Sequence, residues 1–313
     1  MPDSARTREG GRLRLGIGPM LPTSDPFGEG LIRAPGPAAQ RAEQLGFDAV
    51  WTGDHIQFHS ELVESSVALA AAAGATERIG VGFGVLLAAL RPPALVAKQV
   101  AALQIVSGGR LTLGIGVGGE NPAEWEAMGV PVNRRGRRTD DFLAAMPRLL
   151  AGEAVTMPDG TPIPPLLPTA PVPPVWVGGR SEAALRRAAR FGDAWLALFL
   201  DAKRVGSMRE QLAGLAAAEG RPTPAVALSI FVQVGEGASA REEARQYLEG
   251  AYRVDFDRLE RYCAVGSAAE VAERLAGLVE AGVEGFVLMP AVRDTLAQYE
   301  PLAETAALLR AGL

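Results

Sequence analysis

The 313-residue chain has few of the residues that form disulfides or bind metals: one cysteine, Cys263, and two histidines, His55 and His59. A single cysteine forms no internal disulfide and builds no cysteine-based zinc site, so a reducing compartment is expected. Positively charged residues are also outnumbered by negatively charged ones: the chain has 31 Lys and Arg and 36 Asp and Glu, which gives a net charge of −5. Nucleic acid is therefore not an expected partner, since it binds to basic surfaces.

Long hydrophobic runs are missing as well. No stretch of 18 or more apolar residues is present, so no contact with a membrane is expected. Residues 1–11 are polar and charged and lack the apolar core of a signal peptide. We expect a cytoplasmic protein with a disordered tail over residues 1–11 and a single domain over residues 12–313.

The chain does contain an alternation of short apolar runs and longer alanine-rich segments that resemble helices. The eight candidate strands span residues 13–18, 47–52, 78–87, 111–117, 175–178, 194–198, 226–234 and 285–289. Alternating strands and helices predict a parallel sheet with right-handed crossovers. Eight strands in about 300 residues favour a (β/α)8 TIM barrel over an open, doubly wound sheet. Ser267 and Glu270 form a capping-box pattern that predicts a helix ending near Ala281.

One segment interrupts this alternation. Residues 157–174 contain eight prolines, which remove amide donors and block helix formation. The segment could be a linker between domains, but the strand and helix pattern resumes unchanged at Val175. We therefore expect a proline-rich insertion between the fourth and fifth units of the barrel, and we expect it to cover the site.

The apolar run 47–52 ends directly before Asp54 and His55. Imidazole changes its charge near neutral pH, so His55 at the end of a strand is a candidate proton donor or acceptor. A loop histidine that bonds to a neighbour is the alternative. His59 follows four residues later, but position 56 is isoleucine instead of the glutamate of a zinc-binding helix, so no metal is expected.

The fourth strand candidate carries a G-x-G-x-x-G pattern at Gly114, Gly116 and Gly119. As a dinucleotide fingerprint it is weak, because the first two glycines lie within the strand and not after it. We expect instead that these glycines let a flat ligand approach the backbone and that Gly118 and Gly119 bind it. Glu120 then lies at the end of a strand, as His55 does, and is a second candidate for proton transfer. A surface glutamate is the alternative.

A phosphate site is expected after the fifth strand, where Gly178, Gly179, Arg180 and Ser181 precede a predicted helix. Glycine amides at a helix N-terminus, together with an arginine and a serine, suit an anion. The alternative is a tight turn in which Ser181 caps the helix. The basic run 134–138 is typical of a solvated loop, although it could also meet an anionic cofactor tail.

These three groups of residues follow the second, fourth and fifth strands. In a barrel, the C-terminal ends of the strands share one face, and catalysis takes place there. The sequence therefore predicts a single site that combines proton-transferring side chains with a phosphate-binding turn.

The same stretches resemble the bacterial luciferase-like monooxygenase superfamily, and in particular its branch that uses the deazaflavin coenzyme F420. The matching stretches are residues 46–55, 91–99, 106–110, 113–120, 175–181 and 265–267. The resemblance implies a barrel with an insertion, often assembled as a homodimer. It also implies that Asp54 and His55 lie beside the ring of the cofactor, and that Gly178 to Ser181 hold its phosphate.

Two further site features follow from the resemblance. A glutamate at the position of Glu120 donates or accepts a proton in related deazaflavin enzymes. The family also tends to place a non-prolyl cis peptide at the end of the third strand, which maps to Gly84 and Val85. We therefore include both residues among those that contact the cofactor.

The expected function is hydride transfer between coenzyme F420 and a small organic substrate, with His55 and Glu120 transferring protons. One alternative is a monooxygenase that uses reduced FMN and dioxygen. The other is a non-catalytic barrel that only binds a cofactor. The turn formed by Gly118, Gly119 and Glu120 favours the deazaflavin.

Overall fold

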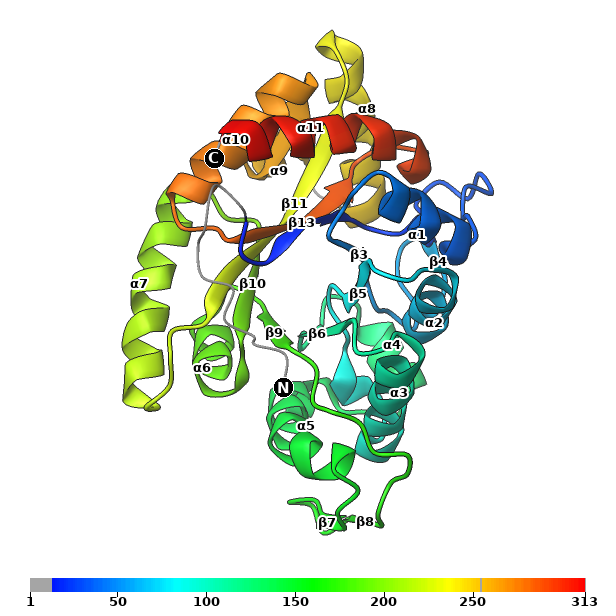
Figure 1. Ribbon diagram of the computed structural model, residues 1–313, viewed down its shortest axis with the longest axis vertical. Helices are drawn as coiled ribbons and strands as arrows, with labels where there is room; N and C mark the ends of the chain where they lie inside the picture. Colours follow the sequence, from blue (N-terminus) through cyan, green and yellow to red (C-terminus); the bar gives the residue numbers. More distant parts are fainter. Residues whose placement is uncertain (1–12, 254, 313) are drawn as a thin grey trace.

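The computed structural model describes residues 13–253 and 255–312, and its centre is one curved parallel sheet (Figure 1). The expected tail at residues 1–11 lies outside the described residues. The strands follow the order β1-β13-β11-β10-β9-β6-β5-β3, and β12 pairs beside β11. Their bounds are β1 (Gly16–Pro19), β3 (Ala49–Thr52), β5 (Gly80–Phe83), β6 (Leu111–Ile115), β9 (Val175–Gly178), β10 (Ala194–Leu198), β11 (Ala225–Val234), β12 (Cys263–Gly266) and β13 (Gly285–Pro290).

The two ends of this sheet meet and close the barrel. The Leu21 amide donates to the Trp51 carbonyl at 2.7 Å, and the Asp48 amide donates to the Ile17 carbonyl at 3.0 Å. Met20 and Trp51 also form a parallel bridge. The predicted (β/α)8 barrel is therefore confirmed, because an open doubly wound sheet would leave β1 and β3 apart.

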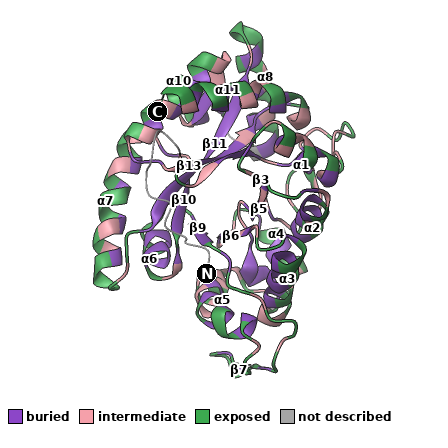
Figure 2. Cartoon of the chain, in the orientation of Figure 1, coloured by how far each residue is buried: buried purple, intermediate pink, exposed green. Residues whose placement is uncertain are grey.

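Helices form the outer layer, with their inner faces buried and their outer faces exposed (Figure 2). Their bounds are α1 (Pro35–Gln44), α2 (Ser65–Ala75), α3 (Pro93–Val106), α4 (Pro122–Ala127), α5 (Arg135–Leu150), α6 (Glu182–Phe191), α7 (Ala202–Ala218), α8 (Gly237–Tyr252), α9 (Phe256–Leu259), α10 (Ala268–Glu280) and α11 (Tyr299–Gly312). The predicted capping box is present, since Ser267 accepts from the Glu270 amide and Glu270 accepts from the Ser267 amide. Within the described residues, no helix has the length and apolar content needed to cross a membrane.

All eight predicted strands are present, and β12 is a strand that the sequence analysis missed. It pairs in parallel with the C-terminal half of β11, with Phe231 opposite Cys263 and Val234 opposite Gly266. β12 is four residues long and only its first two residues are buried, so it lacks the continuous apolar run that marks the other strands. It forms because β11 is ten residues long and extends beyond the part that pairs with β10.

The proline-rich segment does not cover the strands' C-terminal ends, so that expectation was wrong. After α5 the chain returns to the opposite end of the barrel, and there it forms a small hairpin of β7 (Val155–Thr156) and β8 (Pro162–Ile163), at the bottom of Figure 1. The Gln104 side-chain amide, near the end of α3, donates to the Pro171 carbonyl at 3.0 Å. A segment that leads into the start of a strand lies at the strands' N-terminal ends, away from the catalytic face of a barrel.

The glycines of the fourth strand serve packing between neighbouring strands. A Cβ atom at Gly114 would lie 1.9 Å from the Phe83 carbonyl oxygen, and one at Gly116 would lie 2.4 Å from a methyl group of Val85. The sequence analysis attributed these glycines to the approach of a flat ligand. The structure instead shows that β5 and Val85 occupy the space that side chains at 114 and 116 would need.

Candidate active site

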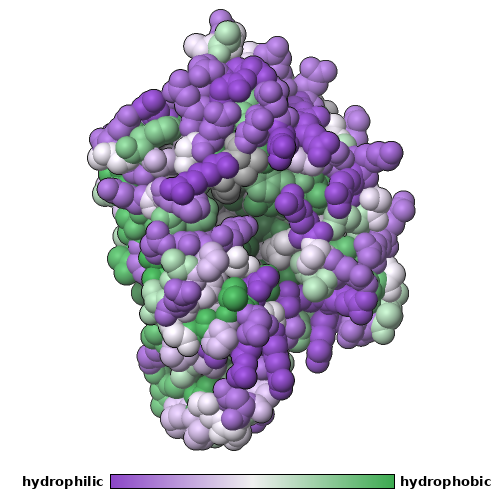
Figure 3. Space-filling view, turned by 180° about the vertical axis from the view of Figure 1, so that it is seen from behind, coloured by the Kyte–Doolittle hydropathy of each residue, from purple (hydrophilic) through white to green (hydrophobic). Residues whose placement is uncertain are grey.

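A cavity of about 380 Å³ lies at the C-terminal ends of the barrel strands. On the face opposite to the view of Figure 1, the molecule is hollowed near its middle, with hydrophobic residues inside the hollow and hydrophilic ones around its rim (Figure 3). Two short antiparallel strands, β2 (Ser24–Asp25) and β4 (Glu61–Leu62), join the loops that follow β1 and β3. Residues of both loops line the cavity, so these loops, and not the proline-rich segment, form its cover.

The structure brings most of the predicted site residues together in the wall of this cavity. Those in the lining are Asp54, His55, Gly84, Val85, Gly118, Glu120, Gly178, Gly179 and Arg180. Gly119 and Ser181 belong to the same turns but are not in the lining. The predicted cis peptide between Gly84 and Val85 is present.

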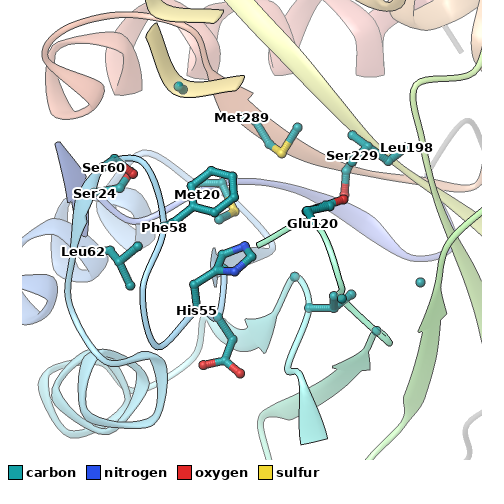
Figure 4. Close-up of a pocket in the computed structure, with 18 of the residues that line it drawn as sticks. Met20, Ser24, His55, Phe58, Ser60, Leu62, Glu120, Leu198, Ser229 and Met289 are labelled. Carbon is teal, nitrogen blue, oxygen red and sulfur yellow. The ribbon is translucent and has the colours of Figure 1, made fainter. Parts of the chain in front are cut away.

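His55 is paired with a glutamate that the sequence analysis did not single out. The Nδ1 atom of His55 lies 3.2 and 3.3 Å from the two carboxylate oxygens of Glu124, whose side chain is fully buried in α4. The Ile56 amide donates to the same carboxylate at 3.2 Å. On its other side the imidazole stacks on the Phe58 ring at 4.3 Å between centroids. His55 is thus both bonded to a neighbour, as the alternative reading held, and part of the cavity wall (Figure 4).

Asp54 has its carboxylate turned into the protein and bonded at both oxygens. Arg91 donates two hydrogen bonds to it, at 2.7 and 2.8 Å, and both side chains are buried. The Ser65 hydroxyl and the Leu87 amide add bonds of 2.8 and 2.9 Å. Burial alone would lower the pKa of Arg91, but its bonds to Asp54 and Glu64 raise it. The Asp54 side chain therefore supports the cavity wall, and the contact with a cofactor that the family resemblance implied for Asp54 stays a prediction.

Glu120 contrasts with these buried carboxylates. It is exposed at the end of the turn that follows β6, and it lines the cavity together with His55 (Figure 4). Arg135 holds this turn in place, since its Nε atom donates to the Gly118 carbonyl at 3.1 Å. Glu120 is thus a carboxylate that solvent and a bound ligand can both reach.

The basic run 134–138 is used mainly for support. Besides the bond from Arg135 to Gly118, the Nε atom of Arg138 donates to the Ala89 carbonyl at 3.0 Å. Arg137 lies 3.8 Å from the Asp141 carboxylate, one helical turn along α5. The bond from Arg135 fixes the turn beside the cavity, while Arg134 and Arg137 are exposed, so contact of this run with an anionic tail stays a prediction.

The expected phosphate turn forms the helix cap that was considered as the alternative, and its binding of phosphate stays a prediction. Ser181 caps α6, with its hydroxyl oxygen accepting from the Ala184 amide at 3.2 Å. Gly179 has a φ of 121°, in the region that favours glycine, and its carbonyl accepts from the Trp195 indole at 2.6 Å. Arg180 is exposed above the Phe199 ring, 5.5 Å from its centroid. The positive end of the α6 dipole and the Arg180 guanidinium therefore lie at one end of the cavity.

The other end of the cavity is largely apolar. Met20, Leu62 and Met289 line it together with the hydroxyl groups of Ser24 and Ser60, whereas Leu198 and Ser229 lie on the opposite side of the cavity (Figure 4). Tyr247 lines it as well, and burial raises the pKa of its phenol, which also bonds to Ser24. Within residues 13–253 and 255–312, no three His, Cys, Asp or Glu side chains are placed to hold a metal ion.

The cavity, with a histidine and carboxylates in its wall, lies at the C-terminal face of a (β/α)8 barrel, which is the face where barrel enzymes have their active sites. The chain belongs to the luciferase-like monooxygenase family, whose model matches residues 30–285.

Two relatives and one solved structure are similar to this chain. An uncharacterised protein of Mycobacterium tuberculosis is 34% identical over 187 residues, which cover 51% of this chain and 63% of that protein. The F420-dependent hydroxymycolic acid dehydrogenase of the same organism is 31% identical over 236 residues, covering 69% of this chain and 63% of the relative. An F420-dependent secondary alcohol dehydrogenase, solved with an F420-acetone adduct, matches 94% of this chain and 99% of its own with a TM-score of 0.81 at 20% identity. This chain therefore spans less than two thirds of the length of these mycobacterial relatives.

The buried pair of Asp54 and Arg91 gives a stability prediction. Asp54→Asn should lower the free energy of unfolding by about 3–5 kcal/mol, because it leaves the buried Arg91 guanidinium without its counter-charge. Glu64→Gln is the matched control, since Glu64 is the partly exposed second partner of Arg91 at 3.2 Å, and its loss should cost below about 1 kcal/mol. Chemical denaturation of both variants measures the difference, and equal losses would contradict it.

Proposed function

We propose that this protein is an oxidoreductase that transfers hydride between coenzyme F420 and a neutral organic substrate. The observation that carries the proposal is the shared cavity of His55, held by Glu124, and the reachable carboxylate of Glu120. Both can exchange protons with a ligand, and hydride chemistry on an alcohol or carbonyl requires such an exchange at oxygen. The names of the mycobacterial dehydrogenase and of the structural neighbour support the choice of F420.

The cavity wall fits a flat ring with an anionic tail. Val85 packs against positions 116 and 178, where a Cβ atom would lie 2.4 and 2.9 Å from its methyl groups, so its side chain lies close to the sheet. With Gly84 and Gly118 beside it, this wall offers a broad surface on which a ring can stack. The end at Arg180 and the α6 N-terminus suits the tail, because both present positive charge.

When bound, the deazaflavin supplies the carbon centre that accepts or donates hydride. The protein's own residues orient the ring, exclude water with the two loops joined by β2 and β4, and move protons. His55 lies at the inner part of the cavity, where it can exchange a proton with a substrate oxygen. Glu120 lies at the rim, where it can exchange a proton with the cofactor ring and with solvent.

A neutral, largely apolar substrate fits the remaining space. Met20, Leu62 and Met289 make this end of the cavity apolar. Besides His55, the groups that could form hydrogen bonds with a substrate there are hydroxyls. Of the charged side chains in the lining, Asp54 is engaged by Arg91, and Arg180 lies at the phosphate-binding end. A phosphorylated substrate would therefore lack a cationic partner at the apolar end of the cavity.

A monooxygenase that uses reduced FMN and dioxygen is the second candidate, because it would suit the family and the apolar cavity equally. The two cofactors share a ring system and a phosphate, so direct binding separates them best. We expect the deazaflavin to bind at least about tenfold more tightly than FMN, a difference of about 1.4 kcal/mol. Fluorescence and calorimetric titration of the purified protein measures both affinities. Equal or tighter binding of FMN would favour the monooxygenase instead.

The proton-transfer roles predict two kinetic effects. His55→Ala and Glu120→Gln should each lower turnover by about 10²–10⁴-fold, which is the usual loss when a general acid or base is removed. Cofactor affinity should change much less for Glu120→Gln, because the amide keeps the size of the carboxylate. Steady-state rates and cofactor titration of each variant test this. Near wild-type turnover in Glu120→Gln would show that solvent provides the proton.

We also propose that two copies of the chain associate through α2 and α3. Val67 on α2 and Leu95, Ile105 and Val106 on α3 are large apolar side chains exposed on neighbouring helices. A surface of this kind can pair with its own copy about a two-fold axis. Ile105→Glu should convert a dimer into a monomer in sedimentation experiments. Leu308→Glu, on the exposed side of α11, is the control and should leave the dimer intact, and a monomeric wild type would refute the proposal.

A further inference from the structure

Glu124 is a fully buried carboxylate beside the proposed proton-transferring histidine, and no role has yet been assigned to it. It belongs to the short helix α4, which follows the turn that carries Glu120. We propose that Glu124 is a positioning residue that fixes the tautomer of His55. In this arrangement the Nδ1–H of His55 points to Glu124, and the Nε2 atom presents its lone pair to the cavity.

The hydrogen bonds around Glu124 determine the direction of this contact. The Ile56 backbone N–H can only donate, so the carboxylate oxygen at 3.2 Å from it is an acceptor. Nδ1 of His55 lies 3.2 and 3.3 Å from the two oxygens of the same carboxylate. We propose that Glu124 is ionised and has only acceptor positions, so that Nδ1 carries the proton. In metal sites and catalytic triads, the group bonded to one ring nitrogen likewise fixes the state of the other.

A contact on one face of the His55 imidazole restricts the rotation of this side chain. The Phe58 ring stacks on His55 with an angle of 22° between the planes. A half-turn flip of the ring would place Cδ2 where Nδ1 lies and would break the bond to Glu124. Smaller rotations would tilt the ring out of its stack on Phe58. Glu124 and Phe58 together therefore fix the orientation of the His55 imidazole.

The tautomer of His55 determines its role in the proposed hydride transfer, and this step rests on the proposed function. A neutral imidazole with a free Nε2 lone pair is an acceptor for the proton of a substrate hydroxyl group. In the oxidation of an alcohol, the carbinol carbon gives a hydride to the oxidised deazaflavin, and the hydroxyl proton passes to Nε2. The C–O single bond becomes a double bond, so the alcohol loses two electrons and the deazaflavin gains them. His55 is then the base in the oxidising direction and, once protonated, the acid in the reverse direction.

Nuclear magnetic resonance of the full-length protein with ¹⁵N-labelled histidine tests the tautomer without any cofactor. The chain has only two histidines, so His59→Asn assigns both pairs of nitrogen signals. We expect Nδ1 of His55 to give the signal of a protonated nitrogen and Nε2 that of an unprotonated one. His59 is exposed and serves as an internal reference.

Glu124→Gln should shift this pattern towards protonation of Nε2. The oxygen that accepts from the Ile56 amide also lies 3.2 Å from Nδ1, but a glutamine NH₂ group in the place of the other oxygen would face Nδ1 as a donor, which weakens the preference for a proton on Nδ1. Glu126→Gln is the matched control, because Glu126 lies two residues further along α4 and is exposed. It should leave both histidine spectra unchanged.

An unprotonated Nδ1 in the wild type would overturn the proposal, as would an unchanged His55 pattern in Glu124→Gln. A titration with F420 then separates this inference from the proposed function. Failure of the wild type to bind F420 would refute the function and leave the tautomer result standing. Conversely, F420 binding with Nδ1 unprotonated would refute the role of Glu124 alone. Affinity for F420 should stay within about twofold in Glu124→Gln, since Glu124 is buried behind His55.

Discussion

The buried ion pair of Asp54 and Arg91 is the interaction on which the site depends most. It joins the end of β3 to the segment before α3, and through Ser65 it also reaches the start of α2. Removing two charges from water is costly and is offset only when each charge finds enough hydrogen bonds. Asp54 has its two oxygens filled by Arg91, Ser65 and Leu87, and this requirement fixes the backbone immediately before His55.

The same rule applies one residue later in the chain. Glu124 is buried, so it too needs donors, and His55 and the Ile56 amide provide them. Two adjacent residues, Asp54 and His55, are thus held by two different buried partners on opposite sides of the strand end. The polar atoms that remain for a ligand are few, and they lie at defined positions on an otherwise apolar wall. Such a site acts mainly by orienting the bound molecule, because it offers few polar contacts.

The sequence predicts the barrel and its site face well because both depend on periodicity and chain direction. Strands of a parallel barrel end on one face, so Asp54, Glu120 and Arg180 could be placed together without knowledge of any contact. The partners could not be found this way. Glu124 and Glu126 lie on the same short helix with similar neighbours in the sequence, and only tertiary packing makes one buried and the other exposed. The proline-rich segment was misplaced although chain direction alone indicates its position, because its composition drew attention to a covering role.

Charge across the cavity finally favours one orientation of bound molecules. Positive charge, from Arg180 and the α6 dipole, lies at one end, while Met20 and Met289 make the other end apolar. An anionic tail at the apolar end would have to lose its hydration without a partner, which costs several kcal/mol per charge. We therefore propose that the tail of a cofactor lies at the α6 end, which leaves the space beside His55 for the substrate. In this proposal electrostatics determines the order of cofactor and substrate in the cavity, and Glu124 determines which nitrogen of His55 the substrate meets.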